Sequence, residues 1–309
     1  MFKPRWVISM LEINKIHNLD CLELRQLPND SVDLIITSPP YAEQRKNVYG
    51  SIPEDKYPSW FEEIGGEIKR VLKPTGSFIL NIKEHSNKDG RSLYVFKTVI
   101  RLVEKCGLNL IDTFAWTKNS FPGKIKNKFK NAWEPCYHFG KSVDISIYPD
   151  NVATDIKPES TARAYRKFTG KTANGSGFQC TASNKMRNAK KAYPSNHLPI
   201  NNILNQWSDN KWHPAVYPKK LCDFFIKSFT KEGSLVIDIF SGSGTTCISA
   251  LKLNRNYLGF EKSKLYSELS EKRIRKYSQQ STLLPLSENS KEDGIPPNNE
   301  LLGILPKII

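Results

Sequence analysis

The sequence predicts an α/β protein with a doubly wound, mostly parallel sheet. Short apolar runs rich in β-branched residues alternate with amphipathic stretches of helical period, the pattern of parallel strands joined by crossover helices. Two of these runs end in residues that stop regular structure: Pro39 and Pro40 follow one, and the glycine-rich residues 241–244 follow another. Hydrophobic residues make up 39% of the chain, which is enough for a core beneath helices on both faces of a sheet.

The first half of the sheet is expected between residues 11 and 117. A short strand and a helical turn come first, and residues 32–36 form a buried strand because they are a short, β-branched apolar run. Further along, the pattern predicts a helix over 57–72, a turn over 73–76, a strand over 77–82, a helix over 93–106 and a strand over 108–116. The turn is placed where Pro74 and Gly76 interrupt the periodicity.

Residues 118–199 break this alternation and are interpreted as an inserted module. They show little periodicity and are rich in Lys, Asn, Ser, Thr and Gly. Between Lys118 and Lys191 there are 15 Lys or Arg and 5 Asp or Glu, so this stretch carries +10 of the net charge of +15. Binding to phosphates releases counterions, so a basic module of this kind indicates a polyanionic partner. A solvated basic surface is the alternative interpretation.

The alternation of strands and helices resumes after the insertion. It predicts a helix over 218–229, a strand over 235–240, a glycine-rich turn, a helix over 245–253, a strand over 257–260 and a helix over 264–277. Residues 278–309 are rich in Ser, Pro, Asn and Glu and are expected to form a loosely ordered tail. The expected segments are therefore 11–117, 118–199, 200–277 and 278–309.

Composition argues against several classes of protein. The six cysteines lie far apart without a C-x-x-C pair, and the five histidines form no paired spacing, so no metal site is expected. No run approaches the ~18 apolar residues of a membrane span. Residues 1–10 lack the apolar stretch of a secretory signal, and a cytoplasmic location without membrane contact is therefore expected.

The strongest chemical signal follows the strand over residues 32–36. Its residues are Thr37, Ser38, Pro39, Pro40 and Tyr41. Two ring-locked prolines can hold the serine hydroxyl and a neighbouring carbonyl as acceptors for the hydrogens of a planar amine, which makes its lone pair available for attack. The tyrosine ring offers a face on which an extruded base can stack. An ordinary proline-rich loop is the alternative for this segment.

The second signal is a strand, a glycine turn and a helix start within residues 238–246. Its sequence is Asp238-Ile239-Phe240-Ser241-Gly242-Ser243-Gly244-Thr245-Thr246. Backbone amides and a helix dipole at such a turn suit a ligand that carries a carboxylate and an amine. No G-K-[ST] follows, which excludes a phosphate-binding P-loop, and the third glycine of the dinucleotide fingerprint is absent.

Two further carboxylates come at the ends of expected strands. Glu261 lies 17 residues after Gly244, where it could accept hydrogen bonds from both hydroxyls of a ribose, or could simply lead the next helix. Asp20 ends the first strand and could accept from an adenine amino group, or could cap a helical turn.

Together these motifs resemble the amino-methyltransferases of DNA, in the permuted order called the beta class. The matching blocks are residues 20–41, the run Trp212-His213-Pro214-Ala215-Val216-Tyr217-Pro218, residues 240–244 and residues 254–261. In that class the catalytic tetrapeptide precedes the target-recognition region, and the cofactor turn follows it. Ile239 departs from the family, which usually has proline after the aspartate.

The resemblance implies a seven-stranded sheet of the methyltransferase type and S-adenosylmethionine as methyl donor, without a metal. It implies that Ser38, Pro39, Pro40 and Tyr41 are catalytic. The cofactor-binding residues that it implies are Asp20, His213, Pro214, Asp238, Phe240, Ser241, Gly242, Gly244, Thr245 and Glu261. Residues 118–199 would then be the target-recognition region, inserted between the catalytic half and the cofactor-binding half.

The resemblance favours cytosine N4 as the target, because serine at the first position of the tetrapeptide usually goes with cytosine and aspartate with adenine. Adenine N6 is the alternative. A methyltransferase acting on RNA or protein, and a DNA-binding regulator that has lost activity, are further alternatives.

Double-stranded DNA is the expected partner. Lys124, Lys126, Lys128 and Lys130 alternate and would lie on one side of an extended segment facing phosphates, while Arg163, Arg166 and Arg187 suit base edges. The resemblance also implies a role in restriction and modification. The partner nuclease would act on the same sequence without forming a stable complex with this chain.

Overall fold

A computed structural model describes residues 7–8, 11–43, 52–85, 90–118, 129, 131–156, 168–171, 177–180, 190–201 and 218–283. The chain divides into two compact units. The first comprises Met1–Ile147 and Asn196–Ile309, and the second comprises Tyr148–Ser195. Within the described residues no helix is both long and apolar enough to cross a membrane.

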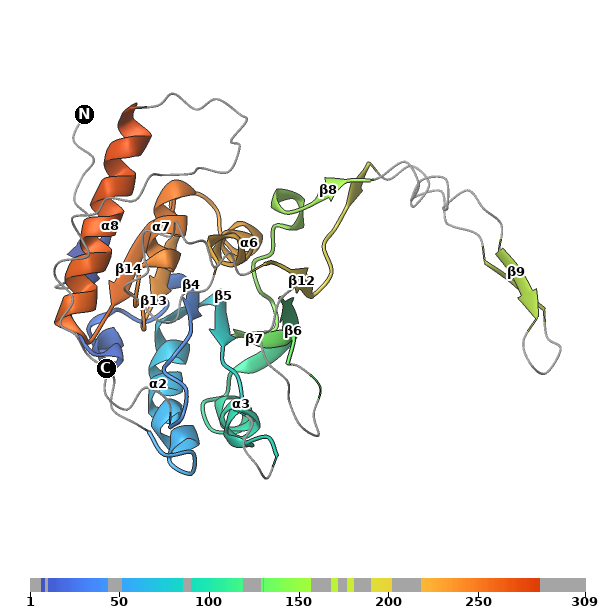
Figure 1. The fold of residues 1–309 in the computed structure, drawn as a ribbon, viewed down its shortest axis with the longest axis horizontal. Coiled ribbons are helices and arrows are strands. Elements are labelled where there is room, and N and C mark those ends of the chain that lie inside the picture. The colour runs from blue at the N-terminus through green and yellow to red at the C-terminus, as the bar shows by residue number, and fades with distance from the viewer. Residues whose placement is uncertain are drawn as a thin grey trace. The chain divides into compact units, whose positions relative to one another are not determined.

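The first unit is built on one mixed sheet of eight strands in the order β12-β6-β7-β5-β4-β13-β14-β3 (Figure 1). The strands are β3 (Lys15–His17), β4 (Val32–Thr37), β5 (Leu72–Asn81), β6 (Asn109–Thr117), β7 (Trp133–Gly140), β12 (His197–Pro199), β13 (Leu235–Asp238) and β14 (Asn256–Phe260). Only β7 runs antiparallel to its neighbours within this sheet. The predicted α/β class with a mostly parallel sheet is confirmed.

Helices cover both faces of the sheet. One core contains buried side chains of α2 (Tyr57–Val71) and α3 (Tyr94–Glu104). The other core contains side chains of α6 (Lys219–Phe229) and α7 (Thr245–Lys252), with a contribution from α8 (Lys264–Leu283). Because each face packs against apolar helix surfaces, the sheet is doubly wound, as the alternation of elements predicts.

The expected count of seven strands is wrong by one, and the expected start of the insertion is wrong too. Strand β7 lies inside the region taken as the insertion, yet it pairs with β5 on one side and β6 on the other. Residues Pro135–Gly140 are all buried, so both faces of this strand are covered and no alternation of polar and apolar residues marks it. Strand β12 adds the eighth strand by pairing with β6.

The second unit is correspondingly smaller than the predicted insertion. It holds two short antiparallel pairs, β8 (Thr154–Asp155) with β11 (Lys191–Ala192) and β9 (Phe168–Lys171) with β10 (Gly177–Cys180). The side chains described on β8 and β11 are exposed. Local pairing of backbone groups therefore accounts for these strands, since a buried apolar face is missing from β8 and β11.

The turn predicted over residues 73–76 is a bulge within β5. Val32 pairs with Leu72 and Leu34 pairs with Ser77, so a single residue of β4, Asp33, faces residues 73–76 of β5. A Cβ atom on Gly76 would lie 3.0 Å from the carbonyl oxygens of Lys73 and Val32. Glycine is thus required by the close approach of the two strands rather than by a chain reversal.

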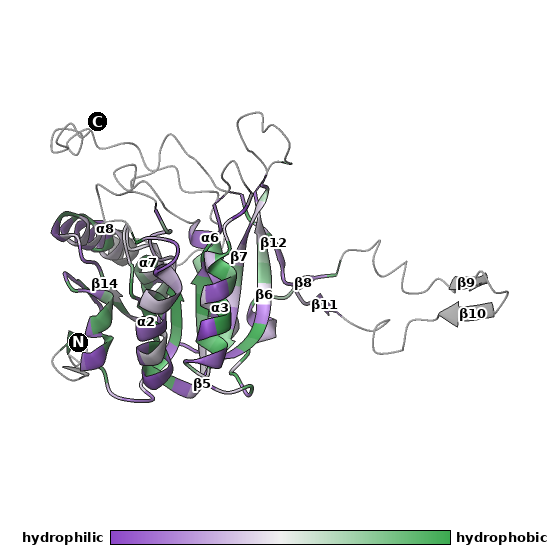
Figure 2. Cartoon of the chain, turned by 90° about the horizontal axis from the view of Figure 1, so that it is seen from below, coloured by the Kyte–Doolittle hydropathy of each residue, from purple (hydrophilic) through white to green (hydrophobic). Residues whose placement is uncertain are grey.

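The predicted tail begins too early, because α8 continues to Leu283. Polar residues dominate its last turns, and α8 is largely hydrophilic along its length (Figure 2). Its buried side chains are few and include Ser267, Ser270 and Ile274. A helix with so narrow a buried stripe cannot be separated from a polar tail by hydrophobic periodicity.

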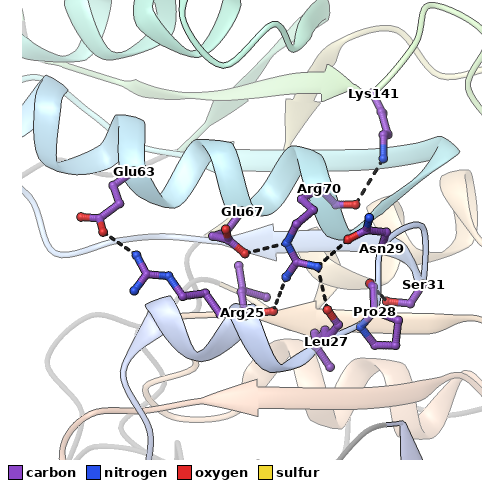
Figure 3. A network of polar contacts seen from close by, with 10 residues as sticks. Arg25, Leu27, Pro28, Asn29, Ser31, Glu63, Glu67, Arg70 and Lys141 are labelled. Atoms are coloured by element: carbon purple, nitrogen blue, oxygen red, sulfur yellow. Dashed lines mark hydrogen bonds and ion pairs between the residues drawn. The ribbon is translucent and has the colours of Figure 1, made fainter.

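A polar network around Arg70 joins α2 to the segment that precedes β4 (Figure 3). The Arg70 guanidinium donates to the carbonyl oxygens of Leu24 and Leu27 at 2.9 and 2.8 Å, and to Asn29 Oδ1 at 2.8 Å. Its Nε atom donates to Glu67 at 2.8 Å. Arg70 therefore satisfies the carbonyls of the 3-10 helix η1 (Cys21–Gln26) and of the loop that leads into β4.

We expect Arg70→Met to lower the free energy of unfolding by about 2–3 kcal/mol, because methionine keeps the aliphatic stem but leaves the two carbonyls without their donor. Urea denaturation would measure the change. Arg25→Met is the matched control, since the exposed Arg25–Glu63 pair in the same network should contribute less than about 1 kcal/mol. Equal losses in the two variants would contradict the role given to Arg70.

Candidate active site

The candidate residues meet at one edge of the sheet, where three neighbouring parallel strands end. Leu34 and Ile35 of β4 pair with Val236 and Ile237 of β13, and Asp238 pairs with Gly259 of β14. The segments that follow these strands therefore leave the sheet side by side. In open α/β sheets this edge is where ligands bind.

Asp238 links the end of β4 to the start of α7. Its Oδ1 atom accepts a hydrogen bond from Thr37 Oγ1 at 2.7 Å, and its Oδ2 atom accepts one from Thr246 Oγ1, also at 2.7 Å. Oδ1 also accepts from the backbone N–H of Phe240 at 3.1 Å. Thr37, Asp238 and Thr246 are each at most 1% exposed. The hydrogen bonds of Asp238 thus brace two segments against each other, the tetrapeptide that starts at Ser38 and the glycine turn.

Two buried tyrosines hold the tetrapeptide. The Tyr57 hydroxyl donates to the carbonyl oxygen of Pro40 at 2.8 Å. The Tyr94 hydroxyl donates to the carbonyl oxygen of Lys83 at 2.6 Å and accepts from the backbone of Ala42. The two rings meet edge to face with centroids 4.8 Å apart. Because both tyrosines belong to core-packed helices, the prolines and the chain that follows them have a fixed position.

Ser38 and Tyr41 lie within hydrogen-bonding distance of each other. The Tyr41 side chain is partly buried against the core, and its hydroxyl shares a hydrogen bond with the Ser38 side chain. Burial raises the pKa of Tyr41 well above its usual value, and the nearby Glu134 carboxylate raises it further. Tyr41 therefore stays neutral.

The glycine turn follows β13 with two residues in left-handed conformation. Gly242 has φ 48° and Gly244 has φ 73°. A Cβ atom on Gly244 would lie 3.0 Å from Ile16 Cδ1 and 3.2 Å from Ser270 Cβ, so packing also demands glycine there. Helix α7 starts directly after Gly244, and its first backbone N–H groups lack partners within the helix.

Glu261 closes the turn from the neighbouring strand. Its Oε2 atom accepts from the backbone N–H of Gly242 at 2.9 Å, and its Oε1 atom accepts from the backbone N–H of Ser263 at 2.8 Å. Only 3% of the residue is exposed. Burial raises the pKa of Glu261, although the two backbone N–H groups act in the opposite direction. The contact with Gly242 ties this carboxylate to the glycine turn.

The other predicted cofactor residues on the glycine turn differ in their burial and in the hydrogen-bond partners of their side chains. Phe240 is partly buried, with its ring centroid 6.0 Å from that of Trp60 on α2. Ser241 is 5% exposed, and its Oγ atom has no hydrogen-bond partner among the described residues. The Thr245 hydroxyl is engaged by Ser243 at 3.1 Å and by Arg273 at 3.3 Å. For Thr245, the backbone N–H at the helix start remains as the candidate contact.

Asp20 caps η1, which was the alternative given for it. Its Oδ1 atom accepts from the backbone N–H of Leu22 at 3.1 Å, and its other oxygen lies 3.1 Å from the Lys262 ammonium. Burial alone would raise the pKa of Asp20, but the hydrogen bonds from Leu22 and Lys262 outweigh it and lower the pKa. Asp20 follows β3, which is separated from β4 in the sheet by β13 and β14, and its ion pair places it beside Lys262, the residue that follows Glu261.

Several predicted residues lie outside the described residues. These are His213, Pro214, Lys124, Lys126, Lys128, Lys130, Arg163, Arg166 and Arg187. Conversely, no sequence motif indicated Tyr57, Tyr94 or Trp60 as parts of the site, and Thr246 stood in the glycine-turn motif without an expected contact. Their spacing fits helices packed on a core, and only their contacts reveal that they face the tetrapeptide or the turn.

Comparisons with known proteins agree with this arrangement. A family model described as DNA methylase, of the N6 and N4 type, matches residues 32–272. The type II methyltransferase M.PvuII of Proteus hauseri is 32% identical over 266 residues, which cover 78% of each chain. The orphan methyltransferase M.BamHII of Bacillus amyloliquefaciens is 30% identical over 252 residues, 80% of this chain and 90% of that one.

Two further similarities bear on the target base. The DNA adenine methyltransferase YhdJ of Escherichia coli is 26% identical over 84% of this chain and 81% of its own. Among solved structures, the cytosine-N4-specific PvuII DNA methyltransferase superposes with a TM-score of 0.62 at 27% identity, covering 86% of this chain and 93% of that one.

Proposed function

This chain belongs to the N6/N4 DNA methylase family, and from that membership we propose that it methylates the exocyclic N4 of cytosine at a specific sequence in double-stranded DNA. The proposed methyl donor is S-adenosylmethionine. The observation that carries the proposal is the buried link from Thr37 through Asp238 to Thr246. It places the tetrapeptide and the glycine turn on adjoining strand ends, as methyl transfer between two bound molecules requires.

The glycine turn fits the proposed donor, which supplies a methyl group activated by a positively charged sulfur. The buried Ser241 hydroxyl, without a partner among the described residues, could bond a polar group of this ligand. The helix start at Thr245 favours its carboxylate through the partial positive charge of the α7 amino terminus. Glu261, held by Gly242 and Ser263, presents a buried carboxylate suited to the ribose hydroxyls.

The tetrapeptide would act on the acceptor amine. The Ser38 hydroxyl and the adjacent backbone carbonyl accept its two hydrogens, so the nitrogen lone pair is withdrawn from the ring and directed at the methyl carbon. The new N–C bond forms as the methyl–sulfur bond breaks, and the amine then releases one proton to solvent. Tyr41 would stack on the extruded base, with its hydroxyl oriented by Ser38.

Cytosine is preferred over adenine on two grounds. Serine occupies the first position of the tetrapeptide, and M.PvuII, whose solved structure is described as cytosine-N4-specific, shares 32% identity with this chain. The similarity to YhdJ, described as a DNA adenine methyltransferase, favours adenine N6 as the second candidate.

We further propose that the basic residues of the insertion contact DNA. Lys124, Lys126, Lys128 and Lys130 would bind phosphates, and Arg163, Arg166 and Arg187 would read base edges. Asp20, His213 and Pro214 complete the proposed cofactor site. The enzyme would protect DNA against a restriction nuclease of the same specificity, as the similarity to a type II enzyme supports, or act alone, as the similarity to an orphan enzyme supports.

Nucleoside analysis tests the proposed function. Plasmid DNA from a host without DNA methylases would be incubated with the protein and methyl-labelled S-adenosylmethionine, digested and separated by mass spectrometry. We expect the label in N4-methylcytosine. Label in N6-methyladenine would select the second candidate. Label in neither base, from protein that binds the cofactor, would favour a regulator without activity.

A further inference from the structure

A cluster of two lysines and one glutamate lies at the same edge of the sheet as the tetrapeptide. Lys83 follows the end of β5, Lys118 follows the end of β6, and Glu134 belongs to β7 between these two strands. Both ammonium groups approach the same atom, Glu134 Oε1. Lys83 lies 3.5 Å from it and Lys118 donates a hydrogen bond to it. We call these three residues the lysine–glutamate cluster.

The cluster is mostly buried and carries one more positive than negative charge. The exposed fractions of its side chains are 16% for Lys83, 12% for Lys118 and 13% for Glu134. Glu84 is the other carboxylate that influences Lys83, but it is paired with Arg91. Burial lowers the pKa of Lys83, and the Lys118 ammonium lowers it further. Two ammonium groups sharing one oxygen are costly unless a further anion balances them.

Rigid contacts fix the cluster beside the tetrapeptide. The Tyr94 hydroxyl bonds both the carbonyl oxygen of Lys83 and the backbone of Ala42, which follows Tyr41. The Glu134 carboxylate is close enough to raise the pKa of Tyr41. The Lys118 ammonium lies 4.0 Å from the centroid of the Trp116 ring, which restrains the side chain further. The ammonium groups are thus prearranged next to the place proposed for the base.

We propose that Lys83 and Lys118 bind a backbone phosphate of the nucleotide whose base is methylated, and that Glu134 balances part of their positive charge before DNA binds. This inference rests on the proposed action on a base in DNA, whichever base that is. A phosphodiester supplies the missing negative charge, and a nucleotide brings its phosphate within a few ångströms of its base. The cluster would thereby hold the extruded nucleotide at the backbone while Tyr41 holds the base.

The test removes the charge from either side of the proposed contact. Duplexes containing the unmethylated target site would carry one neutral methylphosphonate. It would replace the phosphate on one side of the target nucleotide in one duplex and the phosphate on the other side in a second duplex. DNA affinity would be measured in the presence of S-adenosylhomocysteine, the product of the donor. At one of the two positions the wild-type protein should lose about 10-fold to 100-fold in affinity. If neither position mattered, the proposal would be overturned without any variant.

Lys83→Met and Lys118→Met should each lose a similar factor on unmodified DNA and should be less sensitive than the wild-type protein to the methylphosphonate at that position, because one of the two contacts is already gone. Each variant should also reduce the slope of log affinity against log salt concentration by about one, because one counterion fewer is released on binding. If the loss of affinity of a variant on modified DNA equalled the product of the two separate losses, the lysines would not bind this phosphate.

Two controls separate phosphate binding from a structural role. Lys73→Met removes a lysine paired with Asp33 at the other end of β5 and should not change affinity. Glu134→Gln should keep or increase DNA affinity, since it raises the net charge of the cluster, whereas a purely structural ion pair predicts that it weakens binding as the lysine variants do. Melting temperatures would confirm that each variant is folded. A failure to methylate any base would appear in the nucleoside analysis and is thus distinct from these outcomes.

Discussion

Ser38→Ala is expected to lower the rate of methyl transfer by about 100-fold to 1,000-fold while cofactor affinity stays within about twofold of the wild-type value. The hydroxyl would act only as the lone pair of the amine reorients, so its loss affects the transition state more than either bound molecule. Single-turnover kinetics with an unmethylated duplex that contains the target site measure the chemical step, and titration with S-adenosylhomocysteine measures cofactor binding.

Ser31→Ala is the matched control for this experiment. Ser31 precedes β4 as Ser38 follows it, and its hydroxyl donates to the carbonyl oxygen of Pro28 at 2.7 Å, far from the carboxyl edge of the sheet. The Ser31→Ala variant should transfer methyl groups at the wild-type rate. Normal turnover by Ser38→Ala would exclude the acceptor role of this serine, and an equal loss of cofactor affinity would place Ser38 in the cofactor site instead.

Gly242→Asp is expected to weaken cofactor binding by about 100-fold or more. The backbone N–H of Gly242 lies 2.9 Å from Glu261 Oε2, so a new carboxylate would stand beside a buried one of the same charge. It would also occupy the space in which a ligand approaches the backbone at φ 48°. Equilibrium binding of S-adenosylhomocysteine, followed by calorimetry, measures the effect.

Gly233→Asp matches this variant closely. Gly233 also has a positive φ, of 78°, but it is exposed in the turn before β13, and a Cβ atom added there meets nothing within 4 Å. The backbone strain and the added charge are therefore comparable, while the cofactor turn is untouched. If both variants bound the cofactor equally well, the glycine turn would not be the cofactor site.

Much of the fold could be predicted from the sequence because each element carries a local signal. The run over residues 32–36 and the breakers at Pro39 and Pro40 placed Ser38 directly after β4, as the structure has it. The parallel order then required the ends of β4 and β13 to share an edge. Strand β7 could not be found this way, because a strand buried on both faces has no alternation and the surrounding basic residues resemble a loop.

The details of the candidate site depended on contacts between distant segments. Thr37 and Asp238 lie 201 residues apart in sequence, and Lys83, which follows β5, is separated in the chain from Glu134 of β7 by α3 and β6. Residue type alone marked neither Lys83 nor Glu134, and Thr37 was named only as the first residue of the proline motif, without a partner. Their roles become visible only in the folded structure, where they are buried. Burying a polar group without a partner costs free energy, so the partner of each buried group indicates its role.

The sequence by itself determined the α/β class, the succession of catalytic and cofactor motifs and the resemblance to the N6/N4 DNA methylases, because these depend on periodicity and on short motifs read in order. Only the tertiary structure decided that β7 belongs to the core, that Asp238 braces the tetrapeptide against the glycine turn and that two lysines share one carboxylate beside Tyr41. Hydrogen bonds and ion pairs are fixed by distances of a few ångströms, and those distances arise only when the chain has packed.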